Sequence, residues 1–107
     1  MTNFKTHERK TAAALGGKRN VGGKGAFAVD VVHSCFSIEC KTRKTLPGWL
    51  THGMAQARRA ATAEQLPIVV LHRHGEHYVN DVVLIRMSDF IDWFGPVCLP
   101  IEEGSET

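Results

Sequence analysis

Residues 26–42 read AFAVDVVHSCFSIECKT, and this stretch decides the fold. It is rich in Val, Phe and Ile, which favour extended backbone, and it predicts two strands, Ala26–Val32 and Cys35–Thr42. His33-Ser34 between them is short enough for a two-residue hairpin loop. The sequence therefore predicts an antiparallel hairpin near the centre of the fold.

The second of these strands alternates between apolar and polar residues. Ser37, Glu39 and Lys41 therefore lie on one face, because successive side chains of a strand point to opposite faces. A two-residue loop would set Asp30 opposite Ser37 and diagonal to Glu39, at about 7–8 Å between the backbones. The hairpin is thus expected to gather two carboxylates and one lysine on a single face.

Outward from the hairpin, periodicity and turn residues predict three helices, two further strands and a Gly-rich loop. These are a helix Thr6–Leu15, a loop Gly17–Gly25, a helix Gly48–Gln65, strands Pro67–Leu71 and Tyr78–Met87, and a last helix Asp89–Phe94 after a Ser88 cap. The order predicts an α/β (α+β) fold with a central mixed β-sheet flanked by helices. We expect one domain over residues 1–95 and an acidic C-terminal tail over residues 96–107.

The charge of the chain is uneven along its length. Residues 1–60 hold eleven Lys and Arg against three carboxylates, a formal +8, whereas residues 61–107 hold two Arg against eight carboxylates, a formal −6. A basic half of this kind favours a polyanion partner, although a solvated surface gives the same pattern. No apolar run approaches bilayer length or forms a secretory signal, and the three cysteines indicate reduced thiols, so we expect a cytoplasmic protein without a membrane partner.

Two carboxylates that converge on a sheet face repel each other unless a cation joins them. Mg²⁺ suits Asp30 and Glu39, because it takes oxygen ligands and keeps waters and a substrate phosphate. Lys41 would hold an ammonium beside that cation, where it can orient a water and stabilise charge on phosphorus. An E-x-K triplet alone is more often a surface ion pair worth under about 1 kcal/mol, so the hypothesis depends on the whole ordered set.

This ordered set, Asp30 followed by Glu39-Cys40-Lys41, resembles the PD-(D/E)xK nuclease superfamily and, within it, small phage and archaeal Holliday-junction-resolvase-like endonucleases. The similarity covers residues 8–94 and includes an acid on the first helix, Glu8. The resemblance implies a restriction-endonuclease-like core and a homodimeric, Mg²⁺-dependent DNA endonuclease, with Mn²⁺ as a substitute, that acts on branched or duplex DNA in recombination, in a phage-infected bacterial host.

The resemblance also implies roles for single residues. Asp30, Glu39 and the Cys40 backbone carbonyl would bind the metal, Glu8 would contact it directly or through water, and Gln56 would support the site. The basic residues expected to contact nucleic acid are Lys10, Lys18, Arg19, Lys24, Arg43, Lys44 and Arg59. The chain departs from the pattern at Val29, which stands where the motif has Pro, and the Gly-rich loop lacks the Ser or Arg-Ser element of resolvases proper.

Two other functions remain open from the sequence. One is a non-catalytic nucleic-acid-binding or assembly subunit that keeps the nuclease fold, and the other is a ribonuclease with the same chemistry. His72, His74 and His77 could hold a transition metal, but exposed histidines near a turn are the commoner case.

Overall fold

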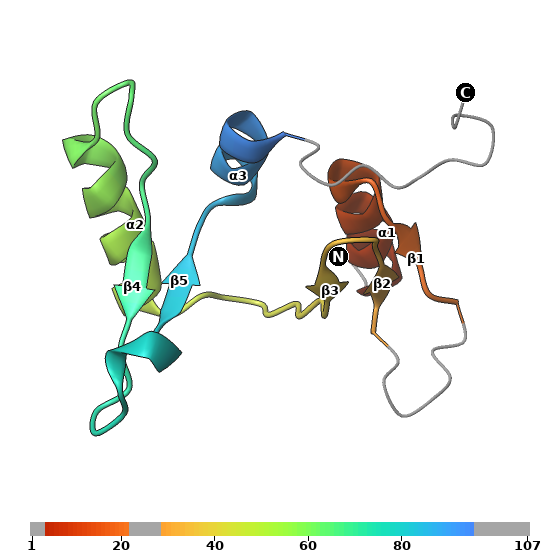
Figure 1. Ribbon diagram of the computed structural model, residues 1–107, viewed down its shortest axis with the longest axis horizontal. Helices are drawn as coiled ribbons and strands as arrows, with labels where there is room; N and C mark the ends of the chain where they lie inside the picture. The colour runs from red at the N-terminus through yellow and green to blue at the C-terminus, as the bar shows by residue number, and fades with distance from the viewer. Residues whose placement is uncertain (1–3, 22–28, 96–107) are drawn as a thin grey trace. The chain divides into compact units, whose positions relative to one another are not determined.

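The computed structural model describes residues 4–21 and 29–95, which combine helices with small antiparallel sheets in an α+β arrangement (Figure 1). The chain divides into two compact units. Unit 1 contains Met1–Arg43 together with Pro96–Thr107, and unit 2 contains Lys44–Gly95. Among the described residues, no helix is both long enough and apolar enough to cross a membrane.

Unit 1 consists of one helix and a three-stranded antiparallel sheet. Its elements are α1 (Phe4–Leu15), β1 (Lys18–Arg19), β2 (Val31–Val32) and β3 (Ser37–Ile38), and the strand order is β1-β2-β3. Helix α1 packs against β1 and β2. The helix was predicted within two residues, but Lys18 and Arg19 were expected in a loop and instead pair with Val32 and Val31.

The core of unit 1 is small and centred on Val31, whose side chain is fully buried. Ala12 and Thr11 of α1 are also buried. Gly17 lets α1 and β1 join close to this core, since a Cβ there would lie 2.7 Å from the Val32 carbonyl oxygen and 2.8 Å from Val31 Cγ1. The close approach therefore requires a glycine at this position.

The turn between β2 and β3 is organised by the His33 ring. Nδ1 accepts hydrogen bonds from the backbone N–H groups of Cys35 (2.9 Å) and Phe36 (3.3 Å). Nε2 lies 2.7 Å from the carbonyl oxygen of Leu15 at the end of α1. The ring thus holds a wider turn than the sequence predicted and ties it to α1.

The wider turn changes the predicted hairpin. Val31 pairs with Ile38 and Val32 with Ser37, so the expected pairing of Asp30 with Ser37 is wrong by two residues. A shift of two residues keeps every side chain on its expected face, because the pleat has a period of two. The two strands are also shorter than predicted, although residues 26–28 of the first lie outside the described residues.

Unit 2 consists of a helix on a two-stranded antiparallel sheet, followed by a short helix. Its elements are α2 (Gly48–Ala60), β4 (Val69–Leu71), the 3-10 helix η1 (Tyr78–Asn80), β5 (Val82–Leu84) and α3 (Met87–Phe94). Met54 of α2 is buried, and Gly53 brings the helix backbone close to Val69 of β4. An ion pair between Arg58 and Asp89 (2.6 Å) joins α2 to α3.

Three predictions for unit 2 need correction. Helix α2 ends at Ala60 and not at Gln65, because Ala61 is extended and the Gln65 side chain accepts from the Thr62 N–H. The expected strand Tyr78–Met87 begins instead as η1, capped by the His77 side chain, and within this range only Val82–Leu84 forms a strand. In addition, α3 begins at Met87 after Arg86, so Ser88 is not its cap.

The prediction of a single mixed β-sheet is also wrong for the described residues. The described strands form two separate sheets, and every pairing within them is antiparallel.

Candidate active site

Asp30, Glu39 and Lys41 all belong to unit 1 and lie at the ends of two paired strands. Asp30 immediately precedes β2, and Glu39 immediately follows β3. The antiparallel pairing of Val31 with Ile38 brings these two strand ends together. The structure therefore brings the aspartate close to the backbone of the E-C-K triplet, as the sequence predicted.

Asp30 is bonded to the residues on either side of Glu39, one by its backbone and the other by its side chain. Its N–H donates to the Ile38 carbonyl (3.1 Å), and its Oδ2 accepts from the Cys40 N–H (2.7 Å). Among the described residues, this is the one hydrogen bond of the half-buried Asp30 side chain. Asp30 thus fixes the backbone on either side of Glu39 and keeps further lone pairs of its carboxylate for other ligands.

Glu39 and Lys41 form a surface ion pair. The distance from Lys41 Nζ to Glu39 Oε2 is 3.0 Å, and the side chains are 67% and 54% exposed, respectively. A pair this exposed contributes at most about 1 kcal/mol to the stability of the fold, so the fold does not depend on it. Both groups remain within reach of a solute, which an active site requires.

Glu8 forms an ion pair with Arg19, a partner that the sequence did not predict. Arg19 Nε donates to Glu8 Oε1 at 2.8 Å, and the Glu8 side chain is only 11% exposed. The pair joins α1 to β1 and neutralises a carboxylate inside unit 1. This ion pair engages Glu8 Oε1 and Arg19 Nε, and the predicted contacts of Glu8 with a metal and of Arg19 with nucleic acid stay predictions.

The donor chemistry of the E-C-K region fits a hard cation better than a soft one. The carboxylates of Asp30 and Glu39 and the carbonyl of Cys40 are all oxygen donors, the type that Mg²⁺ selects. Among the described residues, however, no three His, Cys, Asp or Glu side chains gather closely enough to hold a metal ion. Mg²⁺ needs only one or two carboxylates when water and a substrate phosphate supply its other ligands, so this set is sufficient for it.

Three further predicted residues belong to unit 2. Gln56 and Arg59 are exposed on α2, and Lys44 is exposed before it. Their assigned roles toward the site or nucleic acid stay predictions.

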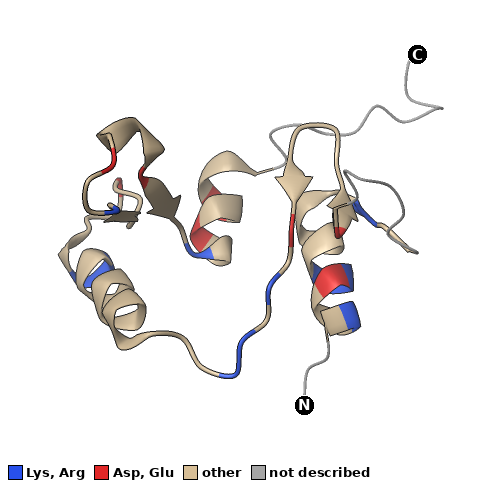
Figure 2. Cartoon of the chain, turned by 90° about the horizontal axis from the view of Figure 1, so that it is seen from below, with Lys and Arg blue, Asp and Glu red and all other residues tan. Residues whose placement is uncertain are grey.

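The predicted basic residues of unit 1 have different surroundings. Lys10, Lys18 and Arg43 are exposed, whereas Lys24 lies outside the described residues. Figure 2 shows Lys and Arg on α1 and along the segment that follows β3. Sequence reasoning missed a contact between these two places, because Thr42 Oγ1 lies 3.1 Å from His7 Nδ1 and no local pattern predicts a pairing over 35 residues.

The histidines of unit 2 agree with the simpler interpretation of exposed turn residues. His72 Nδ1 lies 2.6 Å from Asp81 Oδ1, and His77 Nδ1 accepts from the Val79 N–H at the start of η1. Each ring therefore has a local partner within unit 2.

The cysteines differ from the prediction of reduced thiols. Cys40 is a free thiol, but Cys35 is disulfide-bonded.

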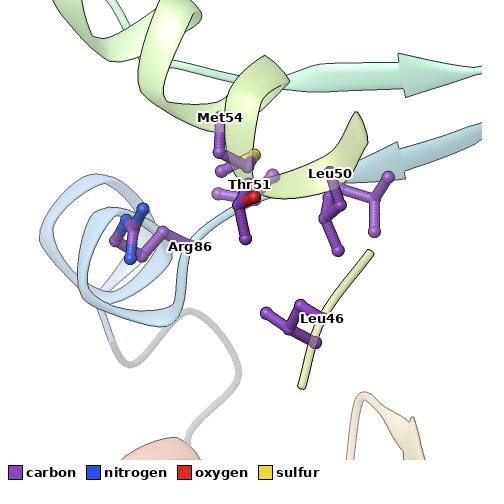
Figure 3. A pocket seen from close by; sticks show the side chains of 7 residues that line it. Leu46, Leu50, Thr51, Met54 and Arg86 are labelled. Carbon is purple, nitrogen blue, oxygen red and sulfur yellow. The ribbon is translucent and has the colours of Figure 1, made fainter. Parts of the chain in front are cut away.

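An apolar pocket of about 320 Å³ lies in unit 2, and its lining includes none of the predicted catalytic residues. Figure 3 shows Leu46, Leu50 and Met54 around it, with Thr51 and Arg86 as its polar members. The Thr51 hydroxyl donates to the Gly48 carbonyl (3.1 Å) within α2. With neither a carboxylate nor a histidine in its lining, this pocket lacks the groups for acid–base or metal chemistry.

No protein-family model, curated protein or solved structure matches this chain.

Proposed function

We propose that this protein is a metal-dependent endonuclease that hydrolyses phosphodiester bonds of DNA, with Asp30, Glu39 and Lys41 as its site and a restriction-endonuclease-like core. The observation that carries the proposal is the hydrogen bond from the Cys40 N–H to Asp30 Oδ2 (2.7 Å). It ties the aspartate to the centre of the E-C-K triplet, which a chance E-x-K on a surface strand would not require. The excess of Lys and Arg over acids among the described residues of unit 1 supports a phosphate substrate.

Each residue has a role that follows from its chemistry. Asp30, Glu39 and the Cys40 carbonyl would hold Mg²⁺, or Mn²⁺ in its place, which supplies a Lewis acid at the scissile phosphate. The Lys41 ammonium lies 3.0 Å from Glu39 and is free to move because it is exposed. It would orient the attacking water and stabilise charge that develops on the phosphate oxygens. Branched DNA as substrate and a homodimer with paired sites belong to the same proposal.

Cleavage of labelled four-way junction, duplex and single-stranded DNA with Mg²⁺ or Mn²⁺ tests the proposal. We expect Glu39→Gln and Lys41→Ala to lower the cleavage rate at least about 100-fold, the loss that follows removal of one transition-state contact. Arg73→Ala, which removes an exposed charge from unit 2, is the matched control and should cleave like the wild type. Equal cutting by all four proteins would mean that the activity comes from a contaminant or another site.

Metal binding can be measured without cleavage. Mn²⁺ is paramagnetic, and we expect it to broaden the amide signals of Asp30 and Cys40 before those of unit 2. Asp30→Asn should weaken this broadening, because it replaces one charged oxygen donor with a neutral amide.

A second candidate is a non-catalytic nucleic-acid-binding subunit. It is favoured by the ion pair that neutralises Glu8 and by the lack, among the described residues, of a cluster of three metal-ligating side chains. In that case no DNA is cut with either metal, and wild type, Glu39→Gln and Lys41→Ala bind DNA equally. A ribonuclease would instead cut RNA in the same assay and leave every DNA intact.

A further inference from the structure

The hydrogen bond between His7 and Thr42 joins two segments of unit 1 that are far apart in sequence. Thr42 Oγ1 lies 3.1 Å from His7 Nδ1, which connects α1 with the segment that follows β3. Both residues are polar, and the contact is at the surface, so it contributes little to the core around Val31. Its consequence is that the segment after β3 is held against one side of α1.

Three cations are close neighbours in the chain of the two residues that form this hydrogen bond. Lys10 follows His7 by three residues on α1, and side chains at this spacing are neighbours about 5–6 Å apart at Cβ. Lys41 and Arg43 flank Thr42 directly in the chain. All three side chains are exposed, so the contact assembles a basic surface from two segments. We call Lys10, Lys41 and Arg43 the basic triad.

The carboxylates of unit 1 leave two members of the basic triad without an acidic partner. Within the described residues, Glu8 pairs with Arg19 and Glu39 with Lys41, whereas neither Lys10 nor Arg43 forms an ion pair. Arg43 Nη1 donates to the Thr42 carbonyl (3.0 Å), which orients the guanidinium and leaves its other N–H groups for a ligand. Two cations in this state, beside Lys41, are suited to bind an anion.

We propose that Lys10 and Arg43, held together by the His7–Thr42 hydrogen bond, contact the phosphate backbone of duplex DNA and deliver it to Lys41. This inference rests on the proposed function for its substrate, but the binding step does not need cleavage. Lysine and arginine contacts to phosphates fix the position of a duplex and carry no sequence information. His7 and Thr42 are then positioning residues, since they act on the DNA only through the two cations.

A duplex fits this surface better than a single strand. Single-strand sites stack successive bases on aromatic side chains. In the described part of unit 1, the exposed large aromatic residue is Phe4, 59% exposed at the start of α1, and no aromatic side chain belongs to the basic triad. The expected interaction is therefore electrostatic and insensitive to base sequence.

The test is the salt dependence of binding to a short labelled duplex. Binding is measured by fluorescence anisotropy in the presence of EDTA, so that no metal-dependent cleavage occurs. Lys10→Ala and Arg43→Ala should each lower the slope of log affinity against log salt by about 0.9, the value for one lost phosphate contact. Arg73→Ala removes the same charge from the exposed turn of unit 2 and should change the slope less. If the three slopes change equally, the assignment of Lys10 and Arg43 to the DNA is wrong.

Thr42→Val tests the hydrogen bond without a change in net charge. We expect it to weaken duplex binding about fivefold, the equivalent of one typical hydrogen bond, while Thr42→Ser keeps the hydroxyl and restores wild-type affinity. Unchanged α1 amide signals in both variants separate this effect from unfolding. Equal affinity of the Val and Ser variants would overturn the role of the His7–Thr42 contact.

Other results separate this inference from the proposed function. Cleavage by wild type with no loss of duplex binding in Lys10→Ala and Arg43→Ala would overturn the surface and leave the nuclease intact. Loss of duplex binding in both variants with no cleavage by wild type would support the surface and overturn the nuclease. Tighter binding of single-stranded DNA or RNA, weakened by the same two substitutions, would overturn the assignment to a duplex.

Discussion

Units 1 and 2 are similar in size, but different interactions hold them together. In unit 1, polar side chains join the elements: Arg19 pairs with the buried Glu8, His33 binds the end of α1, and Asp30 binds the backbone at Cys40. In unit 2, α2 packs on β4 through Met54, and an exposed ion pair joins α2 to α3.

The two units also differ in their balance of charged residues. The described residues of unit 1 carry seven Lys and Arg against three acids, whereas those of unit 2 carry five of each. Each of the three described acids of unit 1 has a partner, but most of its described cations have none among the described carboxylates. The comparison indicates that specific polar contacts and excess positive charge coincide in the described part of unit 1, which is where the candidate site lies.

The largest expected difference in stability between the two units is caused by replacing one glycine in each of them with alanine. Gly17→Ala would place a Cβ 2.7 Å from a backbone carbonyl in unit 1, whereas Gly48→Ala at the start of α2 meets nothing within 4 Å. We expect Gly17→Ala to destabilise unit 1 by about 3 kcal/mol, because a backbone atom cannot move cheaply. Gly48→Ala should stabilise unit 2 by about 0.5 kcal/mol through the unfolded state. Hydrogen exchange of the Val31 amide reports on unit 1.

The two tryptophans provide a separate measurement for unit 2, because Trp49 and Trp93 both belong to it. Their fluorescence during urea unfolding should move to slightly higher urea in Gly48→Ala. A Gly17→Ala protein whose Val31 amide stays as protected as in the wild type would show that the close approach at Gly17 is not formed.

The next comparison is between the two ion pairs. Arg19→Ala leaves Glu8 nearly buried without its partner, and we expect a loss of about 2 kcal/mol, the cost of an unsatisfied buried polar group. Arg58→Ala removes a partner whose side chain is 49% exposed from Asp89, which is 14% exposed. Because solvent at Arg58 weakens this pair, the substitution should cost about 1 kcal/mol or less. A double-mutant cycle with Glu8→Ala isolates the first pair, and zero coupling energy between Glu8 and Arg19 would contradict it.

The sequence predicted features that depend on local periodicity. The helices near residues 6–15 and 48–60 follow from a period of 3.6 residues and were confirmed. The common face of Asp30 and Glu39 follows from a period of two residues and stays a prediction, because both lie just outside the paired strands. The face of a strand survives a shift of two residues, so a wrong loop length did not change which side chains lie together.

The features that the sequence did not predict depend on contacts between distant residues. The partner of Glu8 lies 11 residues away, and the turn geometry depends on a bond from His33 to Leu15, 18 residues earlier. Neither position has a local signal, since Arg19 and Glu8 each had another plausible role in binding. The chemistry of E-C-K was expected from residue types alone, but its attachment to Asp30 through the Cys40 N–H required the structure.

The smallest expected difference in stability is between alanine substitutions of two histidines, one in each unit, that both have polar partners. His33 contacts three backbone groups, and because backbone N–H groups can only donate, its Nδ1 must accept and its Nε2 must carry the ring proton. We expect His33→Ala to cost about 1–2 kcal/mol, because it removes bonds that join the β2–β3 turn to α1. His72→Ala, at a pair whose His72 side chain is 48% exposed, should cost well under about 1 kcal/mol.

Ring nitrogen NMR shifts separate the two cases before any substitution is made. His33 should give one sharp protonated Nε2 and one unprotonated Nδ1, because its contacts select a single tautomer. His72 Nδ1 faces the Asp81 carboxylate, which only accepts, so its proton should reside on Nδ1 instead. The same tautomer at both rings would remove the distinction, and an averaged His33 signal would mean that the turn of unit 1 is not fixed by its polar contacts.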